Sequence, residues 1–501
     1  MAAKAKRSAR TLNHQSIFGL GELYRNGDVS IAEAVKHYLD RIERLDHAGK
    51  HPINSVIEVN PQAKGIARQL DREAKEGGWR GPLHGVPILL KDNIDTGDRM
   101  QTTAGSIALV GSPASHDAFI VSRLRDAGAV ILGKTNLSEW ANFRGTRSVS
   151  GWSSRGGLTR NPHDRTRTAS GSSSGSGAAI AADFAIAAIG TETDGSITCP
   201  ANACGIVGLK PTLGSLSRTG IIPIAHSQDT AGPMTRSVED AALVFAAMRG
   251  VDASDSATRA SRPHLSAPIA LQGEGLRGIR IGVARQLAGS QPRVLAIFER
   301  SLTTLEELGA TLVDDIDFAE CAKARSAEFT VLTYEFKTDL NRYLSRRRHR
   351  TIRSMTDIVR FNTDHADEVL KYFGQEWCID ALASGSLRST AYLEARRLCL
   401  NATRTVIDRE IAKNQLDAVV APTDGPAHVI DTVNGDGNYH DISTTMPAAV
   451  AGYPHITVPC GSIEHLPVGL SFFGRAWSEP ALLNMAYAYE QASSALRPPS
   501  L

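Results

Sequence analysis

Hydrophobic and polar residues follow two patterns along the chain, one typical of strands and one typical of helices. Seven short apolar runs are each bounded by Gly, Pro or Asp, as expected for strands buried on both faces of a sheet. They are INSVIEV (53–59), GVPILLK (85–91), GAVILGK (128–134), GIRIGVA (278–284), LDAVVAPT (416–423), PHITVPCG (454–461) and VGLSFFG (468–474). Helical patterns lie between several of these runs, for example RVLAIFERSLTTLEELGA (293–310). This alternation predicts an α/β fold with helices on the faces of a sheet.

Two further segments are predicted to be helical. DVSIAEAVKHYLDRIERLD (28–46) contains a capping box, since Glu33 follows Ser30 by three positions. Val35, Leu39 and Ile42 then fall on one helical face. From about residue 318 to 400, long charged helical patterns replace the strand signals. We expect a single domain over residues 1–501, with an N-terminal helical segment at about 12–50 and a helical insertion over the sheet at about 318–400.

Composition and charge exclude several classes of protein. The chain has 501 residues, of which 42% are hydrophobic and 22% charged, as in ordinary globular proteins. Its 55 Lys and Arg against 53 Asp and Glu give a net charge of +2, which offers no electrostatic case for binding nucleic acid. Six cysteines without a CxxC spacing indicate neither a disulfide framework nor a zinc site.

Two further features of the sequence predict the cellular compartment of the protein. No apolar run approaches the roughly 20 residues that a membrane helix needs. The N-terminus MAAKAKRSARTLNHQ is basic but has no apolar region typical of a signal peptide. We therefore expect no membrane association and a reducing compartment, the cytoplasm, unless a signal peptide has already been removed.

The segment TASGSSSGSGAAIAADFAIAAIGTETDGSITCPA (168–201) carries the candidate chemistry. A flexible linker is one interpretation, but the Ala-rich run after the Gly/Ser cluster is typical of a buried helix packed against the sheet. A nucleophile elbow is a second, because residues 171–175 satisfy GxSxG; that motif needs a preceding strand, whereas TRNPHDRTRTA is polar. The histidine spacing singles out no Ser–His–Asp triad. A third interpretation joins both serine clusters to an upstream lysine.

The third interpretation rests on a resemblance to a known family. GVPILLKDN (85–93), SGSSSGSGAAIAA (170–182), GTETDGSITCPANACGIVGLKPTLG (190–214) and SQDTAGPMTRSVEDAA (227–242) resemble the amidase signature family in order and spacing. These blocks define a core at about residues 80–245. Within the family, the chain most resembles bacterial peptide amidases, which hydrolyse C-terminal carboxamides of peptides. The resemblance implies one large domain in which helices flank both faces of a mixed β-sheet.

The resemblance also implies a Ser-cisSer-Lys triad. It places the nucleophile on Ser196, the bridging serine with a cis peptide bond on Ser172, and the base on Lys91. Ser173 is expected to support the turn or the lysine. The resemblance assigns the oxyanion hole to the backbone N–H groups of Thr193, Asp194, Gly195 and Ser196. It requires no metal and no cofactor.

The residue types suit this chemistry. A serine hydroxyl is a weak nucleophile until a base removes its proton. A lysine at its usual pKa of about 10.4 is protonated, but burial disfavours the ammonium form and lowers that pKa. The apolar run VPILL would bring Lys91 to the edge of the sheet, where open α/β sheets place their sites. Ser172 would then relay the proton of Ser196 to Lys91 and return it to the leaving amine.

Three positions depart from the common family pattern. Asp194 stands where glycine is usual, Thr198 where arginine is usual, and Glu192 where aspartate is usual. A carboxylate at position 194 would oppose a developing oxyanion unless it is paired or turned away. Asp229 of SQDTAGP is expected to be a structural cap or a backbone clasp.

Several functions remain open at this point. We expect an amidase that acts on a small-molecule or short-peptide carboxamide, such as a peptide C-terminal amide. Aryl-acylamides and carbamates are alternative substrates. A subunit of an amidotransferase that acts on charged tRNA, and a catalytically silent scaffold, are alternatives of another class.

Overall fold

An eleven-stranded sheet runs through the molecule. The computed structural model describes residues 12–501, apart from 266–268, 274, 348 and 438–440. The strand order is β1-β3-β2-β6-β8-β7-β12-β13-β11-β9-β10. The strands are β1 (Val56–Val59), β2 (Pro87–Lys91), β3 (Val130–Thr135), β6 (Ala187–Glu192), β7 (Val207–Lys210), β8 (Thr230–Thr235), β9 (Arg280–Val283), β10 (Thr311–Val313), β11 (Ala418–Pro422), β12 (His455–Ile463) and β13 (Leu466–Phe473). A separate pair joins β4 (Trp152–Ser153) to β5 (Gly157–Leu158).

The sheet is mixed, as the resemblance implies. β2 pairs in parallel with both β3 and β6, whereas β6 pairs antiparallel with β8. All seven apolar runs that predict strands contain one, namely β1, β2, β3, β9, β11, β12 and β13. The prediction of an α/β fold is therefore confirmed.

The Ala-rich run after the serine cluster is not one helix, and here the prediction is wrong. α6 (Ser174–Ala181) ends two residues before Asp183, whose φ of 58° turns the chain. Residues 187–192 then form β6 between β2 and β8. Alanine favours a helix in isolation, but pairing with two neighbouring strands overrides that preference in the centre of a sheet.

Helices cover both faces of the sheet. In β11, Val420 packs in a cluster with α9 (Pro292–Glu307) and α17 (Glu479–Ser493), while Val419 packs in another with α15 (Arg404–Asn414) and α16 (Thr445–Ala451). Neighbouring residues of a strand point to opposite faces, so these two pairs of helices lie on opposite sides. The other helices near the sheet are α4 (Ala63–Lys75), α5 (Phe119–Asp126), α7 (Thr198–Cys204) and α8 (Val238–Met248).

The N-terminal helical segment consists of α2 (Ile17–Arg25) and α3 (Ile31–Arg41), followed by one π-helical turn (Ile42–Asp46). α3 begins with the predicted capping box, because Ser30 and Glu33 each accept a hydrogen bond from the other's backbone N–H. Val35, Leu39 and Ile42 are buried, as their spacing predicts.

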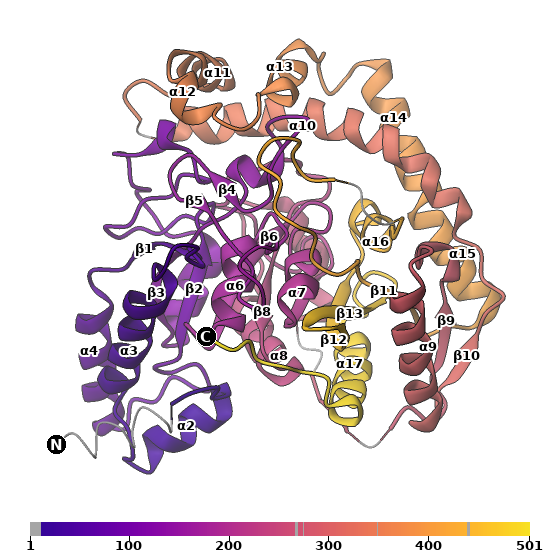
Figure 1. The fold of residues 1–501 in the computed structure, drawn as a ribbon, viewed down its shortest axis with the longest axis horizontal. Helices are drawn as coiled ribbons and strands as arrows, with labels where there is room; N and C mark the ends of the chain where they lie inside the picture. The colour runs from indigo at the N-terminus through magenta and orange to yellow at the C-terminus, as the bar shows by residue number, and fades with distance from the viewer. Residues whose placement is uncertain (1–11, 266–268, 274, 348, 438–440) are drawn as a thin grey trace.

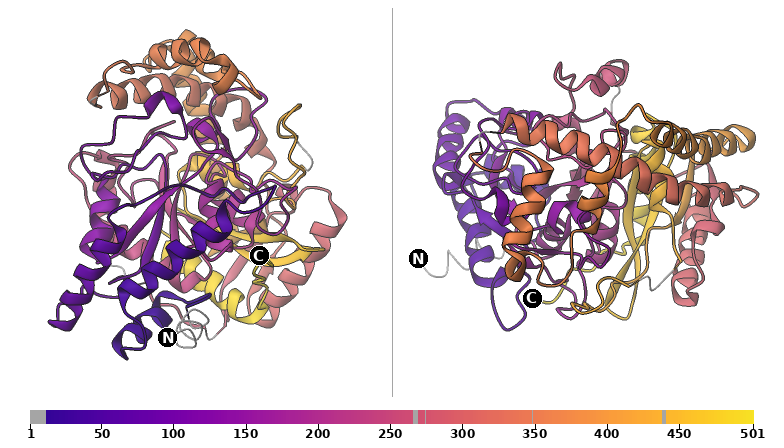
Figure 2. Two further views of the ribbon diagram at one scale, coloured as in Figure 1. Left: turned by 60° about the vertical axis from the view of Figure 1, so that its left-hand side comes forward. Right: turned by 90° about the horizontal axis from the view of Figure 1, so that it is seen from above.

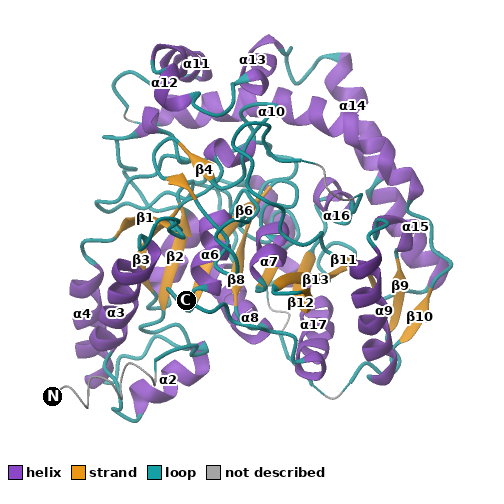
Figure 3. Cartoon of the chain, in the orientation of Figure 1, coloured by secondary structure: helices purple, strands orange, loops and turns teal. Residues whose placement is uncertain are grey.

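A layer of helices lies over one edge of the sheet. It consists of α10 (Ala324–Arg346), α11 (Met355–Asp364), α12 (Ala366–Val369), α13 (Glu376–Ala383) and α14 (Thr390–Ala402). These helices lie along the top of Figure 1, and the turned views of Figure 2 keep them on the same side of the strands. Figure 3 shows that loops gather between this layer and the strands. Among the described residues, none of the helices combines the length and apolar composition that a membrane span requires.

Candidate active site

The candidate site begins where β2 and β6 end. The two strands are parallel neighbours, so their carboxyl ends meet at one edge of the sheet. Leu90 is paired with Ile189, so Lys91, the next residue of β2, lies close to Thr191, which is two positions after Ile189. The Lys91 Nζ lies 2.9 Å from Thr191 Oγ1, 3.1 Å from the Thr191 carbonyl oxygen and 2.7 Å from Ser172 Oγ.

Burial dominates the electrostatics of Lys91. Its side chain is fully buried at 0% exposure. Burial lowers the pKa of the ammonium group to about 7, although the carboxylates of Glu192 and Asp229 act in the opposite direction. Since these carboxylates do not restore the usual value, a large share of Lys91 is neutral at neutral pH.

Ser172 and Ser173 lie just before α6, and each contacts a different part of this group. The peptide bond between Gly171 and Ser172 is cis, as the resemblance implies. Ser172 is buried, with its hydroxyl against Lys91. The Ser173 hydroxyl donates to the Thr191 carbonyl at 3.1 Å and accepts from the Thr191 N–H at 3.2 Å. Ser173 therefore fastens the serine turn to β6 and makes no recorded contact with the lysine.

Ser196 follows a tight turn after β6. Gly195 has a φ of 73°, a left-handed conformation that glycine adopts without strain. The Ser173 N–H donates to the Ser196 carbonyl at 3.1 Å, so the two serine segments lie side by side. Ser196 is 9% exposed, whereas Ser172 and Lys91 are at 0%. The structure thus brings the three residues of the predicted triad into one place, with Ser196 nearest to solvent.

The departures at positions 192 and 198 compensate for each other. The Glu192 carboxylate accepts from the Ile197 N–H at 2.7 Å, from the Thr198 N–H at 3.0 Å and from the Thr198 hydroxyl at 3.2 Å. These bonds cap the N-terminus of α7, where unpaired N–H groups favour a negative charge. They also close the turn that carries residues 193–196.

Asp194 is partly buried. Burial raises the pKa of its carboxyl to about 6, and the charge of Glu192 acts in the same direction. A hydrogen bond from the Thr445 hydroxyl and the charge of Arg325 lower it. The carboxyl is therefore bound by α16, and its negative charge is partly compensated.

The backbone N–H groups of residues 193–196 are the donors that the sequence predicts for an oxyanion hole. Across the described residues, no recorded hydrogen bond uses the N–H group of Thr193, Asp194, Gly195 or Ser196. Asp229 is a clasp in this structure, because its carboxylate accepts from the Thr193 hydroxyl at 2.6 Å and from the N–H groups of Ile224 and Ala225 at 2.8 and 2.9 Å.

Sequence reasoning missed two residues of the group, Thr191 and Gln228. Thr191 gives Lys91 two of its three contacts, and Asn93 Nδ2 also donates to Thr191 Oγ1 at 3.0 Å. The signal for Thr191 was its place in a strand parallel to GVPILLK, which the helical interpretation of the Ala-rich run concealed. Gln228 donates from Nε2 to the Thr193 carbonyl at 3.2 Å, and nothing in the sequence indicates that contact.

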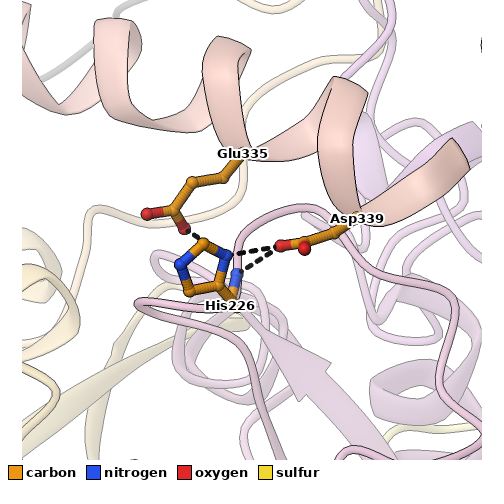
Figure 4. A group of neighbouring side chains, drawn as sticks. All are labelled: His226, Glu335 and Asp339. Carbon is orange, nitrogen blue, oxygen red and sulfur yellow. Dashed lines mark hydrogen bonds and ion pairs between the residues drawn. The ribbon is translucent and has the colours of Figure 1, made fainter. Parts of the chain in front are cut away.

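One further group among the described residues has the ligand types of a metal site, namely His226, Glu335 and Asp339 (Figure 4). Its carboxylates already accept several hydrogen bonds. Asp339 Oδ2 lies 2.7 Å from His226 Nδ1, while Glu335 accepts from the Ser227 N–H at 2.9 Å and from the Tyr392 hydroxyl at 2.7 Å. We interpret the group as a set of hydrogen bonds that joins the loop before β8 to α10.

Known proteins resemble this chain over nearly its whole length. The family model described as Amidase matches residues 33–483. The structure of a peptide amidase from Stenotrophomonas maltophilia has a TM-score of 0.90 and 47% identity, and the match covers 97% of this chain and 98% of that one. A protein of Arabidopsis thaliana named as a probable amidase is 37% identical over 481 residues, covering 93% of this chain and 88% of that protein. A glutamyl-tRNA(Gln) amidotransferase subunit of Moorella thermoacetica is 37% identical over 481 residues, covering 95% of this chain and 96% of that protein.

Proposed function

Since the chain belongs to the amidase family and is an enzyme that acts on linear amides, we propose that it hydrolyses carboxamides through an acyl-enzyme on Ser196. Ser172 is the bridging residue and Lys91 the base. The observation that carries this proposal is the set of three contacts made by Lys91. A neutral amine has two N–H donors and one lone pair. The donors fit the two oxygen atoms of Thr191, and the lone pair then faces the Ser172 hydroxyl at 2.7 Å.

Acylation begins with a proton relay. Ser196 Oγ attacks the amide carbon while its proton passes to Ser172 Oγ, and the proton of Ser172 passes to Lys91 Nζ. The substrate oxygen becomes negatively charged and is held by the N–H groups of the 193–196 turn. A well-placed donor of this kind contributes about 3–4 kcal/mol to catalysis.

The relay then runs in reverse. Lys91 returns its proton through Ser172 to the leaving nitrogen, the carbon–nitrogen bond breaks, and ammonia leaves from a primary amide. Water attacks the ester on Ser196, and its proton follows the same path to Lys91. When the carbon–oxygen bond of the ester breaks, Ser196 regains its proton and the carboxylic acid is released. Lys91 finishes each cycle neutral.

We propose a peptide C-terminal amide as the substrate. The similarity to the Stenotrophomonas maltophilia peptide amidase supports it, since the 47% identity extends over 97% of this chain. The 37% identity to the Moorella thermoacetica protein supports the alternative, in which the chain releases ammonia for a partner protein. Aryl-acylamides and carbamates are alternatives within the hydrolase class.

A substrate panel tests the proposal. The purified chain is incubated separately with an N-blocked dipeptide amide, an anilide, a carbamate, an aliphatic amide and glutamine, and released ammonia or amine is measured. We expect ammonia and the peptide acid from the dipeptide amide, with at least tenfold lower kcat/KM for the other compounds. Ammonia only from glutamine, and only with partner proteins present, would contradict the peptide-amide proposal and favour the amidotransferase.

A further inference from the structure

The loop before β8 is held by one face of α10. Glu328, Glu335 and Asp339 are seven and four positions apart on that helix, a spacing that puts them on one side. We call these three residues the acidic clamp. Three consecutive loop residues contact it, in the pairs His226 with Asp339, Ser227 with Glu335, and Gln228 with Glu328. Figure 4 shows Glu335 and Asp339 reaching down to the loop from successive turns of the helix, with His226 between them.

Gln228 connects the clamp to the turn that carries the nucleophile. Its Nε2 donates to Glu328 Oε1 at 2.8 Å and to the Thr193 carbonyl at 3.2 Å. The next residue, Asp229, accepts from the Thr193 hydroxyl at 2.6 Å. Thr193 is therefore fixed at its backbone and at its side chain by two neighbouring residues of one loop. Gln228 is 1% exposed and Glu328 is 7% exposed, so water does not compete for these bonds.

The bond to the Thr193 carbonyl controls a neighbouring donor. A trans peptide unit is planar, and its C=O and N–H groups point in opposite directions. A hydrogen bond that fixes the Thr193 carbonyl therefore also fixes the direction of the Asp194 N–H, which belongs to the same unit. That N–H is one of the four groups assigned to the oxyanion.

We propose that Gln228 is a positioning residue for the oxyanion hole, and that Glu328 of α10 holds Gln228 in place. The proposal rests on the proposed function, since it takes Ser196 as the nucleophile. It makes α10 part of the catalytic apparatus, although this helix lies more than 100 positions after the turn that it orients. Neither Gln228 nor Glu328 touches the reacting atoms; both act through the Thr193–Asp194 peptide unit.

The charge of Glu328 fits this role. Burial raises the pKa of the Glu328 carboxyl well above its usual value, and the negative charge of Asp194 raises it further. Burial therefore favours the neutral form of Glu328 over the carboxylate, and in that form a carboxyl oxygen still accepts from Gln228. A neutral partner holds Gln228 without adding a negative charge beside the developing oxyanion.

Matched substitutions test the proposal. Gln228→Met keeps the length of the side chain but removes both donors, and Glu328→Leu removes the acceptor. Glu328→Gln keeps a neutral acceptor. The control is Gln375→Met, because Gln375 is also buried and donates to the Val359 carbonyl and the Thr363 hydroxyl, far along the chain from the turn.

Two kinetic measurements and the thermal unfolding midpoint are obtained for each variant. The first is kcat and KM for the best amide of the panel. The second is the rate at which a fluorophosphonate labels Ser196, since the phosphoryl oxygen also needs the oxyanion donors and no amide substrate is required. Loss of one oxyanion donor costs about 10²–10³ in kcat, and a misdirected donor costs part of that. We expect Gln228→Met to lower kcat roughly 10- to 100-fold with KM within about threefold.

The other variants separate positioning from stability. Glu328→Leu should lower kcat about as much as Gln228→Met, and the double variant should be no worse than either, because all three lose the same connection. Glu328→Gln should retain more than about a third of wild-type kcat, and Gln375→Met should lower the unfolding midpoint without lowering kcat.

Unchanged labelling and kcat in Gln228→Met, or normal kcat in Glu328→Leu, would overturn the proposal. If Gln228→Met does not fold, the comparison of kcat between Glu328→Leu and Glu328→Gln decides whether the proposal holds. Failure of wild-type Ser196 to be labelled would instead overturn the proposed function.

Discussion

Amide hydrolysis should depend on pH through the proton of Lys91, and the burial of this lysine sets the pH at which the rate rises. With a pKa of about 7, the neutral fraction of Lys91 is about one tenth at pH 6, one half at pH 7 and nine tenths at pH 8. We therefore expect kcat/KM to rise about tenfold between pH 6 and pH 8 and then to level off. A lysine with the usual pKa of 10.5 would instead give a rise of about a hundredfold over the same interval, with no plateau.

The same shift predicts an effect on stability. The folded protein binds the Lys91 proton more weakly than the unfolded chain does, so unfolding takes up a proton between about pH 7 and pH 10.5. The contribution of Lys91 to the free energy of unfolding thus rises with pH in that window, by about 1.4 kcal/mol per pH unit. Below about pH 7 the buried charge is retained at its full cost, about 5 kcal/mol in all.

Two substitutions make the test specific. Lys91→Arg keeps a positive charge but cannot act as a base at these pH values, so kcat should fall at least about 10³-fold. Lys91→Met should be as inactive, yet it should unfold at an equal or higher temperature than wild type at pH 7, with the advantage shrinking towards pH 10. The pH profile is measured with the best amide of the panel, and unfolding is followed by circular dichroism.

Controls are needed because other carboxyls titrate nearby. Asp194 and Asp229 have pKa values of about 6, and Asp194→Asn should leave the rise near pH 7 in place. A midpoint above pH 9 in wild type, or more than about 1% of wild-type activity in Lys91→Arg, would refute the assignment of Lys91 as the base.

Three further predictions concern the nucleophile and the packing around the site. Ser196→Ala should lower kcat at least about 10³-fold with an unchanged unfolding midpoint, and ammonia release above a few per cent of wild type would remove Ser196 as nucleophile. Arg144→Met should destabilise the protein by about 3–5 kcal/mol, because it leaves the buried Glu139 carboxylate without its partner at 2.8 Å; adding Glu139→Leu should recover part of that loss in a denaturant titration. Gly175→Ala should prevent soluble expression, since a Cβ there would overlap two backbone carbonyl oxygens, whereas Gly65→Ala, with open space around its position in α4, should be neutral or stabilising.

The sequence predicts the fold well where strands are apolar and bounded by turn residues. It does not predict the strands β6, β7 and β8, because their apolar runs are short or rich in small residues. Alanine, glycine and threonine in β6 fit the centre of the sheet because helix α6 packs closely there: a Cβ at Gly190 would lie 2.9 Å from Ser173 Oγ. Nothing local in the sequence shows that two neighbouring strands will impose an extended conformation on an Ala-rich run.

The residues of the candidate site also fall into those that the sequence predicts and those that it does not. Lys91, Ser172 and Ser196 could be predicted because they lie in motifs whose spacing resembles a known family. Thr191 could not, since its contact with Lys91 follows from the parallel register of β2 and β6. Gln228 and Glu328 are 100 positions apart, and only the packing of α10 over the sheet edge brings them together. Short motifs therefore predict the proposed reacting groups, whereas the residues that contact them depend on the three-dimensional arrangement.

Burial by itself does not identify a catalytic base in this protein. Lys91, Lys134 and Lys210 are all at 0% exposure, and burial lowers the pKa of each, to about 7 for Lys91 and about 8 for Lys210. Lys134 donates to the Ile94 carbonyl at 2.6 Å and to a threonine hydroxyl at 2.9 Å, and the charges of nearby aspartates favour its ammonium form. Within the described part of the chain, Lys210 donates only to the next carbonyl along the chain, that of Pro211, at 3.3 Å. Among these three lysines only Lys91 is hydrogen-bonded to a serine hydroxyl, that of Ser172. Ser172 lies beside Ser196, which is 9% exposed to solvent. Under the proposed function, a lysine that has lost its proton is useful only where its lone pair meets a hydroxyl that can pass a proton on, and the end of β2 places Lys91 against such a hydroxyl.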